Sequence, residues 1–219
     1  MGRQTQASQN KPALTQDKIL LAASKVFAER GFKEATTRMI CREAGVNVAL
    51  VNYYFRSKAE LYKAVIASLF EGVAKPLILI ADGARDAETW KDAIRSWVRR
   101  FLGICAATQP PEHWVARLMG MEECLPSDMA EEIMRQFGLP LRKSFLRLLR
   151  MGLESDDPVE LNLWYSRITS QYVVYAIAKP CWTSRFCPPD LDVEVWLDRM
   201  AEHICADIFL RLSYRRFLP

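Results

Sequence analysis

The side chains best suited to chemistry lie in one short segment, Asn47–Phe55, which reads NVALVNYYF. If it is helical, Val51 and Phe55 share one face and pack inward, because residues four apart are neighbours on a helix. An Asn amide can pair with adenine, small apolar side chains can contact a thymine methyl, and a Tyr hydroxyl can bind phosphate. The outward-facing candidates for such contacts are Val48, Ala49, Asn52 and Tyr53.

Flanking residues add groups that can bind phosphate. Thr36 and Thr37 place hydroxyls at one expected helix start, and Lys58 places an ammonium at another. Helix starts attract anions because their first N–H groups have no partner within the helix. Spacing alone leaves two interpretations open: a nucleic-acid contact surface, or a small helical subdomain with a solvated tyrosine or two.

Residues for metal or covalent chemistry are not arranged in a usable pattern. The two histidines, His113 and His203, belong to neither an E-x-x-H nor an H-E-x-x-H sequence, so a di-iron or zinc site lacks its ligands. The sequence contains no G-x-S-x-G, P-loop or G-x-G-x-x-G motif. We therefore expect no metal, no cofactor and no enzymatic activity.

The six cysteines are scattered and form no C-x-x-C pair. In a chain without a visible signal peptide they indicate reduced, mostly buried thiols. Cys181 and Cys187 flank a proline-bounded loop and could sense oxidants, but packing as small apolar residues is the plainer interpretation.

Composition places the chain among globular proteins. Its 219 residues are 50% apolar and 26% charged, so one large or two small domains can bury a core. Nine glycines are few for an all-β chain. No apolar run predicts a membrane span and no secretory signal is visible, so we expect a cytoplasmic protein without a membrane partner.

Charge is distributed unevenly along the chain. Residues 1–60 carry 10 basic and 5 acidic side chains, a balance of +5, and the remainder carries 20 basic and 21 acidic, a balance of −1. A basic N-terminal quarter on a near-neutral remainder is a weak indication of a polyanion partner at one end.

Almost every periodic segment has helical spacing, and no strand is convincing. We expect an all-α protein of about nine helices. Their expected positions are Thr15–Arg30, Thr36–Ala44, Val48–Phe55, Lys58–Ala81 with a break at Pro76, Thr89–Ala107, Pro111–Glu123, Pro126–Gly152 with an interruption at Gly138 and Pro140, Asp157–Lys179, and Asp190–Tyr214.

The first helices have the spacing of a helix-turn-helix. Ala44-Gly45-Val46 forms a turn of small residues between two short segments, which lets the helices cross closely while the later one enters the major groove. The stretch Gly31–Arg38, followed by Ile40, Ala44–Val46 and Tyr54–Leu61, resembles the DNA-binding domain of the tetracycline-repressor (TetR) family. The resemblance covers about residues 15–65 and joins a G-F-x-x-x-T-T opening to a Y-F-x-S-K-x-x-L close.

The resemblance implies a homodimer with one recognition helix per subunit, a palindromic double-stranded operator, and repression relieved by a small ligand. It places Arg38 where the tetracycline repressor has a guanine-reading Arg, and Lys58 at a backbone-contacting Lys. Many members have Ser-Lys-Gly or Ser-Lys-Pro-Thr where Asn47-Val48-Ala49-Leu50 stands, so one Lys contact is missing here. The complete set of expected DNA contacts is Thr36, Thr37, Arg38, Asn47, Val48, Ala49, Asn52, Tyr53, Tyr54 and Lys58.

The C-terminal region resembles a subgroup of the family in short patches. Met121–Pro126, Ser170–Tyr175 and Lys179-Pro180 are similar to the C-terminal domain of the CerR-like (YbiH-like) regulators. Family members dimerise through their last two helices, and apolar rows on the matching segments fit this role, although the same rows would also suit ordinary core. The expected interface residues are Ile168, Tyr172, Tyr175, Trp196, Met200, His203, Ile204 and Ile208.

The family places its effector pocket in this region, where apolar walls with a few polar groups suit a small molecule. Aromatic residues at helical spacing are also typical of plain core. The expected pocket residues are Trp97, Phe101, Trp114, Met121, Glu122, Phe137, Trp164, Tyr165 and Gln171, which favour an aromatic or hydrophobic effector.

These observations divide the chain into a mobile arm (residues 1–14), a DNA-binding domain (15–60) and a ligand-binding and dimerisation domain (61–219). The expected function is a ligand-released transcriptional repressor. Two alternatives stay open: an all-helical carrier or enzyme that retains the fold, and a regulator that responds to a protein or to thiol oxidation.

Overall fold

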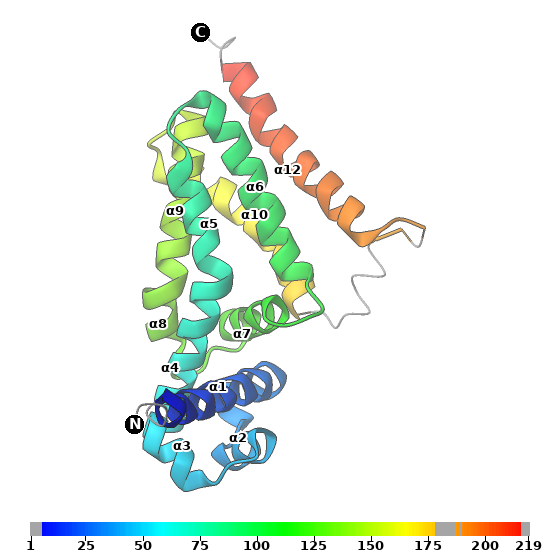
Figure 1. The fold of residues 1–219 in the computed structure, drawn as a ribbon. Helices are drawn as coiled ribbons and strands as arrows, with labels where there is room; N and C mark the ends of the chain where they lie inside the picture. The colour runs from blue at the N-terminus through cyan, green and yellow to red at the C-terminus, as the bar shows by residue number, and fades with distance from the viewer. Residues whose placement is uncertain (1–5, 178–186, 189, 216–219) are drawn as a thin grey trace.

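A computed structural model describes residues 6–177, 187–188 and 190–215, and side chains within 14–86, 89–170, 187–188 and 190–210. The described residues are helical and contain no strand, and they form nine helices when segments joined by π-turns are counted together. Figure 1 shows two parts, a small N-terminal unit and a taller C-terminal body above it. The expected all-α class is confirmed.

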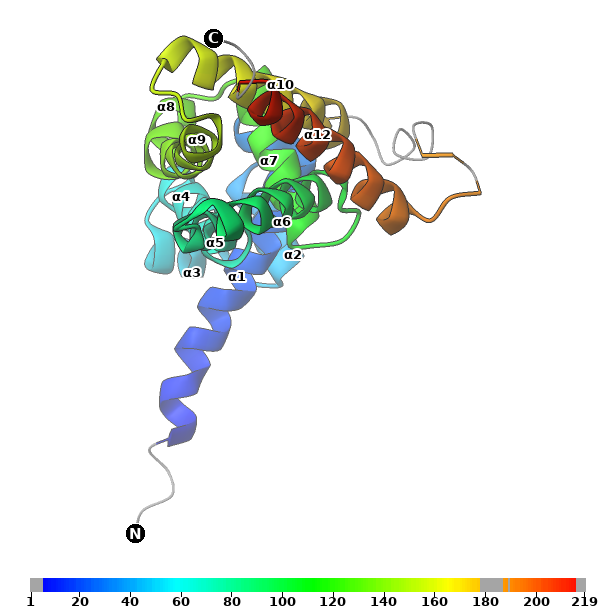
Figure 2. The ribbon, with the colours of Figure 1, turned by 90° about the horizontal axis from the view of Figure 1, so that it is seen from above.

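The N-terminal unit consists of α1 (Gln6–Glu34), α2 (Thr37–Ala44) and α3 (Val48–Phe55). α1 begins at Gln6, within the segment expected to be a mobile arm, and Figure 2 shows that its first turns project away from the body. Gly31 interrupts this helix with φ 73° and ψ 172°, a backbone conformation that glycine adopts without a Cβ penalty.

Local capping chemistry fixes the start of each following helix. The Thr36 hydroxyl accepts a hydrogen bond from the Met39 N–H, Asn47 Oδ1 accepts from the Leu50 N–H, and Ser57 Oγ accepts from the Glu60 N–H. Gly45 closes α2 in the left-handed conformation. The expected helix starts near Thr36, Val48 and Lys58 and the expected turn at Gly45 agree with these caps.

The core of the N-terminal unit extends beyond the first three helices. Buried residues of α1, α2 and α3 pack with the buried face of α4 (Lys58–Leu69). Leu118 of α7 (Glu112–Cys124) and Ile133 of α8 (Ala130–Ile133) complete the same core. The N-terminal unit is therefore packed directly onto two elements of the C-terminal region, and a domain boundary at residue 60 stays a prediction.

The C-terminal body contains a second core. It is built from α5 (Lys75–Gly83), α6 (Ala87–Ala106), α9 (Leu139–Leu153), α10 (Pro158–Ile177) and α12 (Val193–Arg215). Figure 1 shows α12 on the outer side of α6, and Figure 2 shows α10 and α12 together along one side of the body.

Two π-turns join the N-terminal unit to this body. η1 (Phe70–Ala74) links α4 to α5, and η2 (Met134–Gly138) links α8 to α9. Each is closed by an N–H that donates to a carbonyl five residues back, and each is followed by a proline, Pro76 or Pro140, that cannot donate. The expected breaks at these prolines are thus widened turns inside continuous helices.

One predicted helix start is wrong. Asp86, not Thr89, caps α6: its carboxylate accepts from the Thr89 N–H, and the Thr89 hydroxyl accepts from the Asp86 N–H. A hydroxyl three residues inside the helix completes a capping box rather than starting the helix.

One described helical stretch, Lys58–Gly83, is long and apolar enough to cross a membrane, contrary to the absence expected from the sequence. It runs through both cores, where Leu61, Val65, Leu69, Val73 and Leu77 are buried. Packing against the other helices therefore accounts for its apolar face.

Candidate nucleic-acid interface and its links to the body

The outer face of α3 is exposed as the sequence predicts. Tyr53 is 78% exposed and Val48 is 41% exposed, whereas Val51 and Phe55 are buried in the N-terminal core. Ala49 and Asn52 are also exposed. The face therefore presents an amide, two small apolar groups and a phenol to the surroundings, and their contact with DNA stays a prediction.

Tyr54 differs from its neighbour. It is half-buried, packs against the N-terminal core, and meets the Tyr53 ring edge-on with ring centroids 5.2 Å apart. This contact restricts the exposed Tyr53 ring, so less conformational entropy is lost when a ligand immobilises it.

The capping residues keep groups free for a second partner. Asn47 uses Oδ1 for the cap, which leaves its amide N–H groups free, and the Thr36 hydroxyl can still donate. Thr37 is half-buried and Arg38 is exposed, both in the first turn of α2. Each of these residues lies where a helix start favours an anion.

Lys58 has a structural role that the sequence did not indicate. Its Nζ donates to the carbonyls of Phe32 (2.8 Å), Ala35 (3.0 Å) and Lys33 (3.4 Å), and lies 4.5 Å from the centre of the Phe32 ring. All three ammonium protons have acceptors, so Lys58 ties the end of α1 to the start of α4. A phosphate contact by this ammonium stays a prediction and requires one of these bonds to be replaced.

Two exposed cations beside α3 were missed in the sequence. Arg42 lies in the last turn of α2, and Arg56 follows α3 with a positive φ of 59°. The sequence feature that could have indicated them is the excess of basic residues in 1–60, but a net charge does not identify individual side chains. Both suit sequence-independent phosphate contacts.

The expected pocket residues fall into two separate groups. Trp97 is 1% exposed and stacks on Phe145, with ring centroids 3.7 Å apart, and on Phe101, at 5.0 Å. Tyr165 contacts Phe145 from α10, and Trp164 is buried in the same core. These aromatic residues of the C-terminal body fill each other's space.

The other group lies against the N-terminal unit instead. Trp114 and Phe137 pack on the N-terminal core, and the Met121 sulfur lies 3.5 Å from the position of a Cβ at Gly31. The expectation of one pocket formed by all these residues is therefore corrected. The side chain of Gln171 lies outside the described residues.

Glu122 links two helices rather than lining a pocket with Trp97. The Tyr62 hydroxyl of α4 donates to Glu122 Oε1 at 2.7 Å, and the Ser127 N–H and hydroxyl also donate to this carboxylate. Burial and the adjacent Glu122 carboxylate raise the pKa of Tyr62 well above its ordinary value. The pair therefore connects the N-terminal core to α7.

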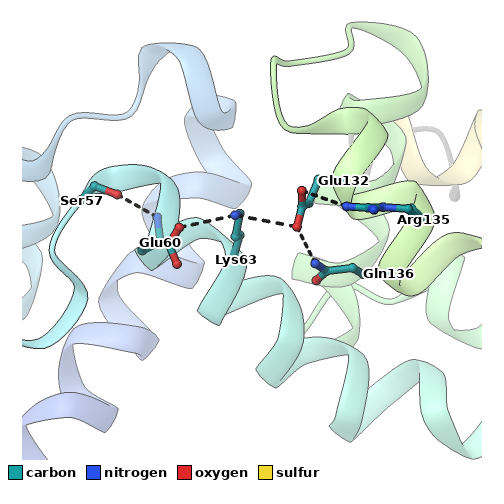
Figure 3. Close-up of polar contacts among 6 residues, drawn as sticks. All are labelled: Ser57, Glu60, Lys63, Glu132, Arg135 and Gln136. Carbon is teal, nitrogen blue, oxygen red and sulfur yellow. Dashed lines mark hydrogen bonds and ion pairs between the residues drawn. The ribbon is translucent and has the colours of Figure 1, made fainter.

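Three more contacts cross the same boundary. Lys33 Nζ donates to the Pro126 carbonyl, and Arg117 Nε donates to the Ala28 carbonyl. Figure 3 shows the third, in which Lys63 of α4 lies between Glu60 of its own helix and Glu132 of α8, at 3.4 and 3.7 Å. A displacement of α7 or α8 would thus be transmitted to the helices that position α3.

Several expected dimer residues are part of the chain's own core. Ile168, Ile204 and Ile208 are buried there and offer little surface to a partner. Trp196 and Met200 pack against the same core but stay partly exposed, so their interface role stays a prediction. His203 is exposed. The side chains of Tyr172 and Tyr175 lie outside the described residues.

Most described cysteines are packed as small apolar residues. Burial raises the pKa of the Cys105 thiol, and it raises the pKa of Cys205 to about 12. Cys187 is buried and Cys124 is exposed, whereas Cys181 lies outside the described residues. No group of His, Cys, Asp and Glu among the described residues is arranged to hold a metal ion.

Comparison with known proteins identifies the class to which this arrangement belongs. Residues 19–65 match the model of bacterial regulatory proteins of the tetR family. Residues 90–211 match the C-terminal domain of the HTH-type transcriptional dual regulator CecR. The chain belongs to the TetR family of transcriptional regulators, with a CecR-type C-terminal domain, and is not an enzyme.

Two curated relatives cover most of the chain. The probable regulator YttP of Bacillus subtilis is 25% identical over 68% of this chain and 70% of its own length. The dual regulator CecR of Shigella flexneri is 28% identical over 68% of this chain and 72% of its own length.

Solved structures share the fold. FadR from Bacillus halodurans superposes with a TM-score of 0.63 at 17% identity, covering 86% of this chain and 97% of its own. FadR from Bacillus subtilis, solved in complex with stearoyl-CoA, has a TM-score of 0.63 at 14% identity, covering 87% and 97%.

Proposed function

We propose that this regulator is a cytoplasmic repressor that binds a palindromic operator as a homodimer and is released by a small molecule. The observation that carries the proposal is the exposed face of α3, on which Ala49, Asn52 and Tyr53 stand out from a capped, tightly packed helix. A recognition helix needs this combination of a rigid backbone and exposed groups that can reach base edges.

Exposed apolar residues on the outer helices support the homodimer. Val159 and Leu163 of α10 are 64% and 67% exposed, and Val195 and Leu210 of α12 are also exposed. These four replace the buried isoleucines as the proposed centre of the interface. Two copies of one chain then place two α3 helices on one palindrome.

The contacts between the two units support release by a ligand. A molecule bound in the C-terminal body can lower DNA affinity only if it binds the non-operator arrangement more tightly. The Tyr62–Glu122 contact joins α4 to α7, and the Lys63–Glu132 contact joins α4 to α8, so a shift of α7 or α8 would reach the N-terminal unit through α4. The stearoyl-CoA bound by the Bacillus subtilis neighbour supports a ligand site in this fold, without naming the effector here.

DNA binding by purified protein tests the proposal. We would measure fluorescence anisotropy with the DNA upstream of the gene, using the wild type and the variants Arg38→Ala, Asn52→Ala and Tyr53→Ala. Each loss is expected to weaken specific binding by roughly five- to a hundredfold, because a good base contact contributes about 1–3 kcal/mol. Lys91→Ala removes an exposed cation from α6 and is the control.

The outcomes separate the proposal from its alternatives. Affinity should fall steeply with salt, since each neutralised phosphate releases counterions. Binding that all three variants leave unchanged would remove α3 as the reading helix. Transcription that rises when operator is bound would establish an activator instead of a repressor.

A further inference from the structure

A cleft opens between α6 and α12, away from the aromatic residues expected to form the pocket. It has a volume of about 740 Å³ and lies along the C-terminal half of α6, the loop after it and the start of α12. Ile104 and Leu197 are buried and form its apolar wall. Its volume falls in the range of small-molecule sites, which are mostly apolar with a few placed polar groups.

One of the two arginines in the cleft is already neutralised. Arg99 pairs with both Glu194 and Asp198 across the α6–α12 contact. Desolvation lowers the pKa of Arg99, but the two carboxylates together outweigh it and raise the pKa above its ordinary value. Arg99 therefore holds α12 against α6, and Glu194 is already paired.

Arg100, the second arginine, has no such partner. Its Nε is buried without a hydrogen-bond acceptor, and no described residue forms an ion pair with its guanidinium. A partly buried cation without a counter-ion is costly, and arginine does not lose its proton at ordinary pH. The cleft thus presents an unpaired, permanently charged donor group.

The cleft is not positively charged overall, so an anion there must be held by a direct contact. Arg99 is shared by Glu194 and Asp198, which leaves one negative charge at that end, and Glu112 balances Arg100. Glu112 lies in the first turn of α7, where the helix start stabilises a carboxylate. Of the two arginines in the cleft, Arg100 is the one whose donors are not taken by a carboxylate, and it is the group that would bind an anion.

We propose that this cleft binds a small monocarboxylate with an apolar body. The carboxylate accepts hydrogen bonds from Arg100, and the apolar part lies on Ile104 and Leu197. The inference rests on the proposed function, because such a molecule would be the effector or one of its class. Since the cleft includes the loop between α6 and α7, its occupation would act on the helix that carries Glu122.

Calorimetric titration of the full chain tests the site. The probes are benzoate and octanoate, each compared with its uncharged amide and with inorganic phosphate. We expect at least one carboxylate to bind, and its amide to bind at least roughly tenfold more weakly, because charge-assisted hydrogen bonds are about twice as strong as neutral ones. Arg100→Gln should weaken carboxylate binding by a similar factor, whereas Lys91→Gln, which removes a cation from the same helix, should not.

Stability separates a binding role from a structural one. Arg100→Met should leave the melting temperature of the free protein unchanged or raise it, because it removes an unpaired charge and orphans no partner. In contrast, Arg99→Met should lower it, since Glu194 and Asp198 lose their partner. A drop for Arg100→Met as large as that for Arg99→Met would assign Arg100 a structural role and overturn the proposal.

The remaining outcomes are equally decisive. Failure of both carboxylates at millimolar concentration, binding that Arg100→Gln leaves intact, or phosphate binding as tight as octanoate would each overturn the proposal. Carboxylate binding that depends on Arg100 but does not change operator affinity would preserve the site and remove its role as effector. If the ligand-free protein did not bind operator DNA at all, the proposed regulatory function would be contradicted, and the carboxylate site would not.

Discussion

At the scale of single residues, Gly152 lies so close to the Trp90 ring that a Cβ at this position would clash with it. A Cβ at Gly152 would lie 1.7 Å from Cζ2 of Trp90. The Trp90 ring cannot withdraw freely, because its Nε1 donates to the Leu148 carbonyl at 2.6 Å and its ring forms an edge-type contact with Phe209. We predict that Gly152→Ala lowers the free energy of unfolding by about 1–3 kcal/mol, measured by urea denaturation.

Gly83 provides the matched control. It lies in the last turn of α5, and a Cβ there would meet nothing within 4 Å. Gly83→Ala should be neutral or stabilising by up to about 1 kcal/mol, because alanine favours the helix. Equal effects of the two substitutions would show that the Trp90 contact does not determine the cost.

Tyr62 should make stability depend on alkaline pH. Its folded pKa is raised by burial and by Glu122, so its hydrogen bond stabilises fully below the unfolded value of about 10 and less as the pH rises above it. We predict that the wild type loses stability above this pH more steeply than Tyr62→Phe does. At neutral pH, Tyr62→Phe should cost about 1 kcal/mol for the lost hydrogen bond.

Chemical denaturation across this pH range measures the effect. Glu122→Gln removes the charge but keeps an acceptor, so its curve should fall between those of the wild type and Tyr62→Phe. Parallel curves for the wild type and Tyr62→Phe would contradict the assigned contact.

At the scale of elements, we expect the two π-turns to be weak points of two otherwise continuous helices. η1 and η2 meet through Phe70 and Phe137, whose ring centroids are 5.1 Å apart. Wider turns have poorer hydrogen-bond geometry, and Pro76 and Pro140 remove a donor after each. Bending at this level would change the angle between the N-terminal unit and the body.

Hydrogen exchange tests this view of η1. We predict faster amide exchange in Phe70–Ala74 than in α4 before it, and slower exchange there in Pro76→Ala, because the restored N–H can donate to Gly72. Pro158→Ala is the control, since Pro158 begins α10 where no intrahelical donor is needed. Equal protection of η1 and α4 in the wild type would exclude η1 as a weak point.

At the scale of the whole molecule, what the sequence predicted correctly was local. Asn47, Gly45 and Ser57 fix helix ends through bonds to residues within a few positions, so their roles follow from type and spacing. The outward face of α3 follows in the same way from Val51 and Phe55. Both π-turns escaped prediction because a proline indicates a break but not the hydrogen bonds that replace it.

Contacts between side chains far apart in the chain could not be predicted from the sequence. Ile204 and Trp97 have the same apolar character whether they face a partner, a ligand or their own core, and only the packing of α6, α9, α10 and α12 decides between these. Glu122 was noticed as a polar residue, but its partner Tyr62 lies 60 positions away. Arg100 could not be distinguished from Arg99 until the acidic residues of α12 were placed beside one of them.

The apolar side chains that stay exposed after the helices pack limit how two copies of the molecule can associate. Leu163 is 67% exposed on α10, and Leu79 is 61% exposed on α5, so the two leucines have similar exposure on different faces. We predict that Leu163→Glu converts the proposed homodimer to a monomer in sedimentation velocity, because two facing carboxylates at a symmetric interface repel each other and lose apolar burial. Leu79→Glu should remain a dimer.

Operator binding should follow the same division. A Leu163→Glu monomer can contact only one half-site at a time, so its affinity for the full palindrome should approach that for an isolated half-site, because the second contact is no longer intramolecular. Leu79→Glu should keep the full difference between the two DNAs. If Leu163→Glu sedimented as a dimer, the subunits would have to meet through another face, and the spacing of the two α3 helices would have to be derived from that face instead.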